Sequence, residues 1–297
     1  MAAIVPDHKA LGGALRMMCV MNSAQPHAYA RVLTIAGSDS GGGAGIQADL
    51  KTMAALGCYG MSALTALTAQ NTVGVQGIHA VPAPFLKAQI QSVMDDIGVD
   101  AIKIGMLHAP DIVEVVAWAI DQYRPAHVVL DPVMVATSGD RLIAQETVQE
   151  LVRQLFPRVS LITPNLDEAQ WLLGRPLNAA ADLPQASQDL LAMGARAVLL
   201  KGGHLPGDEV VDWLQIPDQP GQRLASRRIP SRNVHGTGCT LSSAIASHLA
   251  LGHGLAQAVM LARHYILGAI EAGAQMRLGS GHGPLNHGHA PQSTRVL

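Results

Sequence analysis

The sequence predicts an α/β domain with a mostly parallel β-sheet that is covered by helices on both faces. Short apolar runs rich in β-branched residues alternate with longer segments of helical periodicity from residue 31 onward. The runs are apolar throughout, as expected of strands that are buried on both sides. Hydrophobic residues make up 48% of the 297-residue chain and charged residues 14%, which is enough apolar material for a sizeable core.

The expected strands alternate with helical segments along the chain. One such segment, "IQADLKTMAAL", carries Ile46, Leu50 and Met53 on a single stripe. Strands that alternate with helices are typical of βαβ units, whose strands are parallel. No internal repeat and no linker divides the region, so we expect one α/β domain. The expected strands are the runs 31–37, 61–71, 101–106, 127–134, 161–165 and 197–203.

We expect this domain to occupy residues 29–290. Residues 1–28 are expected to be a poorly ordered leader and residues 291–297 a tail. Met21 is an alternative to Met1 as the natural start of the chain. The segment 215–228 is interpreted as a hairpin or lid.

The composition favours small-molecule chemistry. The net charge is −2 without basic or acidic runs, so neither nucleic acid nor an anionic membrane is an expected partner. No apolar run approaches the roughly 20 residues of a membrane span. Cys19, Cys58 and Cys239 are odd in number and form no CxxC pair, which indicates reduced thiols and a cytoplasmic location.

Polar residues and glycines follow each expected strand. The carboxyl ends of strands in an open parallel sheet lie along one edge, where ligands bind. Turn-forming residues follow strands in general, but here all six runs end this way, several with Asp, Asn, Gln or Lys. We therefore expect a site formed by Gly37–Asp39, Gln70–Asn71, Gly105–Met106, Asp131–Pro132, Thr163–Asn165 and Lys201–Gly203.

A first glycine cluster, residues 36–49, lies between an expected strand and an expected helix. Read from Gly43, "GAGIQA" fits the GxGxxA fingerprint of dinucleotide-binding sites. The loop is too long for that fingerprint, and the second strand lacks a following acidic residue for a ribose. The glycines are interpreted instead as allowing close approach of the backbone to a ligand.

A second glycine cluster, "HGTGCTLSSAIASHLA", begins a helix with one apolar stripe. Free N–H groups and the helix dipole attract a phosphate, which Gly236, Thr237 and Gly238 are expected to bind. Cys239 lies in the first turn, where the dipole lowers the pKa of a thiol; the alternative is a small buried hydrophobic residue. A thiolate here could accept the proton of an attacking hydroxyl in phosphoryl transfer. His248, on the same stripe, is interpreted as a hydrogen-bonded boundary residue.

Residues at further strand ends fit the same chemistry. Asn165 and Glu168 lie three apart at a helix start, so both side chains share a face and suit Mg²⁺, directly or through water. The alternative is a capping box, and both roles can coexist. Lys201 is placed to reach a nucleotide phosphate. Asp131 is expected to orient the waters of the metal, although Asp before Pro also begins ordinary turns.

Together these motifs resemble the hydroxymethylpyrimidine/phosphomethylpyrimidine kinases of thiamine biosynthesis, in the ribokinase-like superfamily. The similarity runs from about residue 31 to residue 287, and no P-loop or protein-kinase motif is present. It implies a three-layer α/β/α fold with at most a small lid, ATP as phosphoryl donor with Mg²⁺, and a homodimer. The matching motifs are "TIAGSDSGGGAGIQADLKT", "TALTAQNT", "KIGML", "VVLDPVM", "LITPNLDEA", "LLKGGH" and "HGTGCTLSSAIA".

The resemblance implies two phosphorylations, of 4-amino-5-hydroxymethyl-2-methylpyrimidine to its monophosphate and then to its diphosphate. It makes Cys239 the base and Gly236, Thr237 and Gly238 the anion hole. The ATP site is expected at Lys201, Asn165, Asp131 and Thr237, and Mg²⁺ at Glu168 and Asp131. The implied substrate-binding residues are Gln70, Asp49, Met106, Gly37 and Ala44.

Two other functions fit the same residues. A pyridoxal or pyridoxine kinase would act on a similar hydroxymethylated heteroaromatic, although Gln70 suits an aminopyrimidine. A regulator that binds a vitamin or nucleotide without catalysis would not need Cys239, Lys201 and Glu168 together. The first loop departs from the family by reading "SDSGGGAG" instead of "DPSGGAG". The histidines of the last segment, His282, His287 and His289, are interpreted as part of a flexible tail rather than a metal site.

Overall fold

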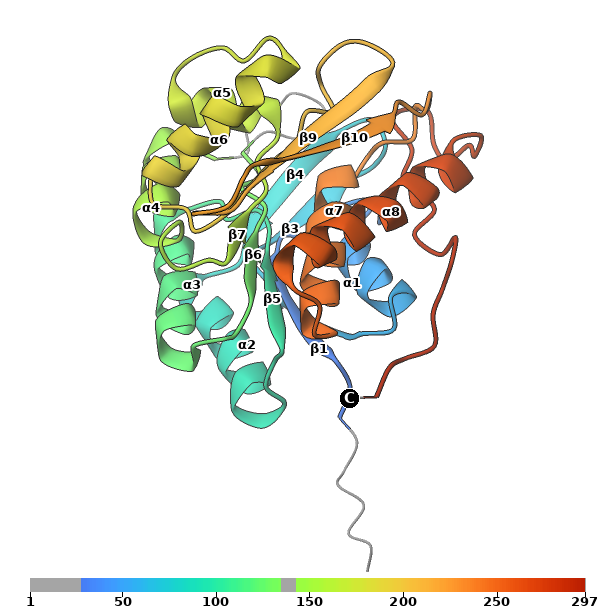
Figure 1. Ribbon diagram of the computed structural model, residues 1–297. Helices are drawn as coiled ribbons and strands as arrows, with labels where there is room; N and C mark the ends of the chain where they lie inside the picture. Colours follow the sequence, from blue (N-terminus) through green and yellow to red (C-terminus); the bar gives the residue numbers. More distant parts are fainter. Residues whose placement is uncertain (1–27, 135–142, 297) are drawn as a thin grey trace, which may run out of the picture.

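The computed structural model describes residues 28–134 and 143–296, and a central β-sheet with helices on both faces organises them (Figure 1). The strands β2, β1, β5, β6, β7 and β8 pair in parallel, whereas β9 and β10 pair antiparallel. The predicted mostly parallel sheet is therefore confirmed. In spatial order, the eight strands of this sheet in the described chain are β10 (Gln222–Arg227), β9 (Glu209–Gln215), β8 (Val198–Leu200), β7 (Leu161–Ile162), β6 (Val128–Leu130), β5 (Ala101–Ile104), β1 (Arg31–Ala36) and β2 (Tyr59–Leu64).

The helices form a layer on each face, so the three-layer α/β/α fold is also confirmed (Figure 1). One layer contains α1 (Gly45–Ala55), α7 (Thr237–Ala250) and α8 (Leu255–Gly273). The other contains α2 (Ala83–Asp96), α3 (Pro110–Tyr123), α4 (Gln145–Gln154), α5 (Leu166–Leu173) and α6 (Leu183–Ala192), the last preceded by the 3₁₀ turn η1 (Ala180–Asp182). Within the described ranges, no helix is long and apolar enough to cross a membrane.

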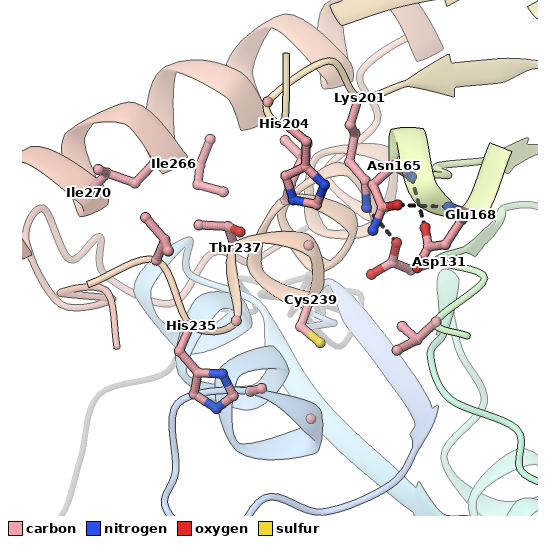
Figure 2. A pocket seen from close by; sticks show the side chains of 18 of the residues that line it. Asp131, Asn165, Glu168, Lys201, His204, His235, Thr237, Cys239, Ile266 and Ile270 are labelled. Carbon is pink, nitrogen blue, oxygen red and sulfur yellow. Dashed lines mark hydrogen bonds and ion pairs between the residues drawn. The ribbon is translucent and has the colours of Figure 1, made fainter. Parts of the chain in front are cut away.

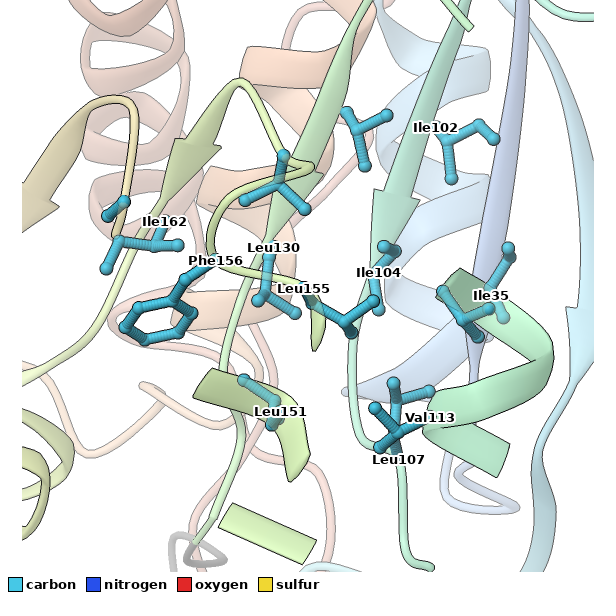
Figure 3. Close-up of a cluster of buried hydrophobic side chains, with 14 of the residues drawn as sticks. Ile35, Ile102, Ile104, Leu107, Val113, Leu130, Leu151, Leu155, Phe156 and Ile162 are labelled. Atoms are coloured by element: carbon cyan, nitrogen blue, oxygen red, sulfur yellow. The ribbon is translucent and has the colours of Figure 1, made fainter. Parts of the chain in front are cut away.

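The strands are apolar throughout because both faces of the sheet are buried. Successive side chains of a strand point to opposite faces. In β1, Leu33 and Ile35 pack in the core below α2–α6, whereas Val32 packs in the core below α7 and α8. Figure 3 shows Ile35 of β1, Ile104 of the adjacent strand β5 and Leu130 of the next strand, β6, in the first of these cores. The apolar runs therefore predicted the parallel strands of the main sheet, but not β9 and β10.

The expected strand 61–71 is two strands, so its prediction as a single parallel strand was wrong. β2 ends at Leu64, and the chain then leaves the main sheet as β3 (Ala66–Gln70). β3 pairs antiparallel with β4 (Val75–Ala80), and these two strands of the described chain form a separate sheet. Side chains of β3 alternate between buried and exposed, the pattern of a strand with one covered face. Gln70 therefore lies on a hairpin rather than at the carboxyl end of a parallel strand.

The segment 215–228 is confirmed as a hairpin. β9 and β10 pair antiparallel, with Gln222 opposite Leu214. The hairpin begins earlier than expected, at Glu209, and β9 pairs antiparallel with β8. It therefore extends the main sheet at one edge.

The chain after α8 packs on the domain, so the expectation of a flexible tail was wrong. His287 is buried, with Nε2 3.0 Å from the hydroxyl oxygen of Thr240 in α7. The Tyr265 hydroxyl donates to the carbonyl oxygen of His287 at 2.6 Å. His289 packs against the ring of Tyr265, with ring centroids 5.0 Å apart. These three contacts join the segment after α8 to helix positions distant in sequence, which a local pattern does not reveal.

The last described residues return to the start of β1. The amide of Gln292 donates to the carbonyl oxygen of Ala55 at the end of α1. Val296 then forms an antiparallel bridge with Tyr29. The two ends of the described domain therefore meet at the amino end of β1, whereas the expected site lies at the carboxyl ends of the strands. The expected leader, apart from residue 28, lies outside the described residues.

His248 of α7 is buried but not hydrogen-bonded, contrary to our interpretation. Its side chain is 7% exposed, and neither ring nitrogen has a hydrogen-bond partner among the described residues. Burial, together with the nearby His253 and Arg295, lowers the pKa of His248 to about 4. The folded state therefore disfavours a proton on this ring.

We expect His248 to make the protein less stable in mild acid. Its ring binds a proton in the unfolded chain near pH 6.5 but in the folded protein only near pH 4. Stability is thus lost as the pH falls through this window, by about 2 kcal/mol at pH 5. Thermal melts of His248→Leu should show a smaller fall in Tm from pH 7 to pH 5 than the parent. His79→Gln, on exposed β4, is the control, and a parent-like fall in His248→Leu would contradict the assignment.

Candidate active site

Two glycine loops from distant parts of the chain meet at the carboxyl edge of the sheet. The first lies between β1 and α1, and the second precedes α7. Gly236 has a φ of +84°, a left-handed conformation that favours glycine. A Cβ on Gly236 would also overlap the carbonyl oxygen of Gly43. The two loops are therefore in backbone contact, and only glycine allows it.

Asp39 fixes the first loop and joins it to the second. One carboxylate oxygen accepts from the amide of Gly41 at 2.8 Å, and the other accepts from Gly43 at 3.0 Å and Ala44 at 2.8 Å. Nε2 of His235, in the second loop, lies 2.8 Å from the same second oxygen. Burial favours the neutral acid, but the contacts with His235 and the loop amides outweigh it and lower the pKa of Asp39. The loop is thus held around a carboxylate anion.

The start of α7 provides an open anion-binding position. Its N-cap, Gly236, supplies no side chain to the free N–H groups of the first turn. These groups and the helix dipole favour a bound anion. A Cβ on Gly238 would lie 3.1 Å from Oδ2 of Asp131 and 3.2 Å from Nζ of Lys201. The missing side chain of Gly238 therefore leaves space between the helix start and these two charges.

Cys239 follows these glycines, but its pKa is raised rather than lowered. Burial raises it to about 11, against the opposing effects of Lys103 and of a hydrogen bond from the amide of Gly45. The predicted depression of this pKa by the helix dipole was wrong, because the sequence does not show how closely other side chains surround this half-buried residue. Cys239 is a neutral thiol at neutral pH in the unliganded protein.

A buried group of charges lies opposite the start of α7 (Figure 2). Nζ of Lys201 is 2.8 Å from Oδ1 of Asp131, which also accepts from the Thr163 hydroxyl at 3.0 Å. Asn165 and Glu168 form the capping box of α5, with bonds of 2.7 and 2.9 Å. The structural alternative for these two residues is thus confirmed. Because Asn165 and Glu168 also border the cavity, capping of the helix is compatible with a second role in binding a ligand or a cation.

Burial and neighbouring charges set the protonation of this group. Burial opposes charge on Lys201, but attraction by Asp131 and Glu168 outweighs it and raises the pKa of Lys201. Burial raises the pKa of Glu168 to about 7, with Lys201 opposing and Asp131 adding to the shift. A cation that entered here would be attracted by Glu168 in its ionised form.

Asp49 is the predicted substrate-binding residue that does not line the cavity. Its side chain is fully buried, and its two oxygens lie 3.0 and 2.9 Å from Nζ of Lys103 in β5. The hydroxyls of Thr34 and Ser243 each donate to it at 2.6 Å. Its acceptor positions are thus engaged beneath the cavity floor. The prediction of a substrate-lining Asp49 was wrong because the sequence does not show that Lys103 points at it.

The other predicted site residues border one cavity of about 720 Å³, which is large enough for two small-molecule ligands. It lies between the carboxyl ends of the parallel strands, the β3–β4 hairpin and the starts of α5 and α7. Of the predicted residues, it brings together Gly37, Ala44, Gln70, Met106, Asp131, Asn165, Glu168, Lys201, Gly236, Thr237, Gly238 and Cys239.

The first loop and the β3–β4 hairpin form one end of the cavity. The hydroxyl of Ser40 donates to the carbonyl oxygen of Gln70 at 2.7 Å and accepts from its amide at 2.8 Å. The Gln70 side-chain oxygen accepts from Thr68 at 3.1 Å. A Cβ on Gly37 would lie 2.8 Å from the Met106 methyl carbon, so these residues are in contact. This end offers a fixed amide beside an apolar sulfur-containing side chain.

The other end is formed by α8 and by loop 202–208, of which the sequence predicted only Gly202 and Gly203, at the end of an expected strand. Ile266 and Ile270 of α8 face the cavity, with His204 opposite (Figure 2). Arg228 holds the loop by donating to the carbonyl oxygens of Gly203, Leu205 and Gly207. Asp39 belongs to the expected strand end Gly37–Asp39, but its contact with His235 was not predicted. His235 was missed, since its only signal was a His before a glycine turn.

Mg²⁺ fits the donors of the buried charge group. It takes oxygen ligands and keeps several waters, so one or two carboxylates suffice beside phosphates. Oδ2 of Asp131 faces the space at Gly238, and Glu168 adds a second carboxylate. No group of three or more His, Cys, Asp or Glu side chains in the described ranges could hold a metal on its own. A cation here would therefore share its ligands with a bound phosphate.

Comparison with known proteins agrees with this geometry. The family model described as "Phosphomethylpyrimidine kinase" matches residues 39–286. The chain is 47% identical to the hydroxymethylpyrimidine/phosphomethylpyrimidine kinase of Escherichia coli K12 over 259 residues, covering 87% of the chain and 97% of that protein. It is 48% identical to a thiamine biosynthesis bifunctional protein of Geobacter sulfurreducens over 95% of the chain, but spans only 57% of that longer protein.

Among solved structures, a pyridoxal kinase of Bacillus subtilis in complex with ADP superimposes with a TM-score of 0.81. It is 38% identical and covers 88% of this chain and 98% of its own. The fold is thus that of a nucleotide-binding small-molecule kinase, with greater sequence identity to the pyrimidine kinases. The matched family model and the identity over nearly all of the E. coli protein show that the chain belongs to the phosphomethylpyrimidine kinase family.

Proposed function

We propose that this protein transfers the γ-phosphate of ATP to 4-amino-5-hydroxymethyl-2-methylpyrimidine and then to the resulting monophosphate, in thiamine biosynthesis. The observation that carries the proposal is one cavity in which the open start of α7, Cys239 and the Asp131–Lys201 pair face one another. Phosphoryl transfer depends on positioning and charge stabilisation rather than on covalent chemistry by the protein. The free thiols Cys58 and Cys239 fit a reducing cytoplasm.

ATP and the pyrimidine are proposed to enter from opposite ends of the cavity. The apolar side chains of Ile266 and Ile270 suit a nucleobase, and Lys201 and the N–H groups of α7 suit its phosphates. Asp131 and Glu168 would hold Mg²⁺, directly or through water, and the ion would neutralise phosphate charge. The pyrimidine is proposed to bind at the other end of the cavity, beside Gln70, Gly37, Ala44 and Met106. A primary amide can pair with the amino group and ring nitrogen of an aminopyrimidine.

The first transfer needs a proton acceptor. The hydroxymethyl oxygen attacks the γ-phosphorus, its bond to phosphorus forms, and the bond from the γ-phosphorus to the bridging oxygen breaks, releasing ADP. The proton of the hydroxyl goes to Cys239, which has to be a thiolate at that moment. The second transfer starts from a phosphate monoester that is already largely ionised at neutral pH, because its second pKa is about 6. It therefore needs no base.

Pyridoxal is the second candidate substrate. The likeness to the Bacillus subtilis pyridoxal kinase extends over 88% of the chain, so the fold does not separate the two activities.

A homodimer is also part of the proposal. The β3–β4 sheet has only two strands in the described chain, and Ser38 and Ser40 of the first loop already bond to the outer edge of β3. The exposed strand β4 is therefore the edge that we propose pairs with a second copy. Sedimentation at the mass of one chain would contradict this part.

We expect ³¹P NMR of the protein with MgATP and hydroxymethylpyrimidine to show a monoester signal followed by a diphosphate signal. A parallel tube with pyridoxal should give little product. Pyridoxal phosphate alone would move the assignment to the second candidate, with the same fold and most of the same site. Absence of product in both tubes would favour a binding role.

We expect Cys239→Ala to slow the first transfer by about 10²–10⁴-fold, the usual contribution of a positioned base. The second transfer should change by less than about threefold, because its acceptor is already ionised. Single-turnover rates with each acceptor measure the two steps. Equal losses in both would mean that Cys239 is structural or binds phosphate.

Lys201→Ala should slow both transfers by about 10²-fold or more, since both develop charge on the same phosphate. Lys87→Ala is a matched control: Lys87 lies over the Trp118 ring, 4.1 Å from its centroid, and does not border the cavity. Rates that are unchanged in Lys201→Ala would remove this residue from the site.

A further inference from the structure

Lys103 is a fully buried cation that the proposed reaction does not yet use. Its side chain has no exposed surface, although lysine is almost never fully buried unless paired. It comes from the central strand β5, and its ammonium lies against both oxygens of Asp49. A Cβ on Gly105 would lie 2.9 Å from Nζ, so the glycine of "KIGM" makes room for this group.

Asp49, Lys103, Thr34 and Ser243 form a buried charge cluster. Thr34 Oγ1 and Ser243 Oγ each donate to Asp49 at 2.6 Å, so both carboxylate oxygens accept a hydroxyl as well as the ammonium. The residues come from β1, α1, β5 and α7. The ammonium therefore has a fixed position, set by elements of both the sheet and one helix layer.

The cluster is linked to Cys239 through α7. Ser243 is four residues after Cys239 in α7, so the two side chains share one face of the helix. Lys103 and Cys239 both border the cavity. Their charges interact: the thiolate of Cys239 favours the charged form of Lys103, and Lys103 favours the thiolate.

Four charged groups act electrostatically on the Cys239 sulfur. Lys103 of β5 and Lys201, which follows β8, are cationic, whereas Asp49 of α1 and Asp131, which follows β6, are anionic. The Gly45 amide adds a hydrogen bond. Burial opposes the thiolate, and of the interactions that favour it Lys103 is the strongest. The sulfur is thus placed where one fixed cation offsets part of the effect of burial.

We propose that Lys103 is a positioning residue for the phosphoryl transfer: its ammonium, fixed by Asp49, is the counter-charge that the Cys239 sulfur faces when it accepts the hydroxyl proton. The proposal deepens the function proposed above and rests on it for its role in the reaction. The electrostatic interaction between Lys103 and Cys239 can be tested without that function. The proposal predicts opposite changes in the reactivity of Cys239 when Lys103 and when Asp49 is replaced.

Alkylation of Cys239 by iodoacetamide at pH 8.5, followed by mass spectrometry of its peptide, reports the thiolate. Lys103→Met removes the cation and should slow alkylation about tenfold. At a pH below the pKa of the thiol, a rise of about one unit in that pKa lowers the thiolate fraction about tenfold. Asp49→Asn keeps the shape of the side chain but removes the anion, so the unpaired cation should accelerate alkylation about tenfold. Mapping the peptide separates Cys239 from the other cysteines.

Thr34→Val is the matched control, since it removes one hydrogen bond of the cluster and no charge. Its alkylation rate should stay within about threefold of the parent, because no charge changes. A purely structural cluster would give rates that move in the same direction in Lys103→Met and Asp49→Asn, and that result would overturn the proposal. If Lys103→Met does not fold, slower or unchanged alkylation in Asp49→Asn is sufficient to overturn it.

Single-turnover kinetics tests the catalytic part. Lys103→Met should slow the first transfer about tenfold more than the second, because only the first needs the thiolate. Equal slowing of both transfers would contradict a role through Cys239. If Cys239→Ala leaves the rate of the first transfer unchanged, Cys239 is not the base and that part of the proposed function is wrong. Opposite changes in the alkylation rate in Lys103→Met and Asp49→Asn would still show the electrostatic interaction between Lys103 and Cys239.

Discussion

The ion pair between Lys103 and Asp49 is the contact on which the arrangement of the site depends. A charge pair withdrawn from water is stable only when each charge keeps its partner, and loss of one partner costs about 3–5 kcal/mol. Because Thr34 and Ser243 complete the pair, β1, α1, β5 and α7 must approach one another in one way. That approach determines where α1 and α7 begin, and both glycine loops lie at those two helix starts. The backbone contact between Gly43 and Gly236 follows from it.

Exclusion of water from the site has opposite effects on two requirements of the proposed reaction. Exclusion of water strengthens every interaction with a transferring phosphate. It also makes a thiolate expensive, so Cys239 is held as a thiol with a pKa of about 11. A base in a dry site therefore needs a nearby positive charge, and a lysine that is paired with an aspartate keeps its charge without contact with solvent.

Local patterns in the sequence predicted the parallel strands of the main sheet, the start of α7 and the capping box at Asn165 and Glu168. These features depend on residues that are close in sequence, so spacing and periodicity reveal them. Contacts between distant residues could not be predicted. The Asp39–His235 pair joins positions in the two loops, and Asp49 is turned away from the cavity by a lysine on another strand. The break after Leu64 and the buried, unpaired ring of His248 were missed for the same reason.

The bridge between Tyr29 and Val296 brings both ends of the described domain to the amino side of the sheet, away from the cavity. A polypeptide joined at either end would leave from the same place and would not need to pass the mouth of the cavity. This geometry makes the domain suitable as one module of a longer enzyme. The relative from Geobacter sulfurreducens, in which the matching region is 57% of the chain and which is described as bifunctional, has this kind of architecture.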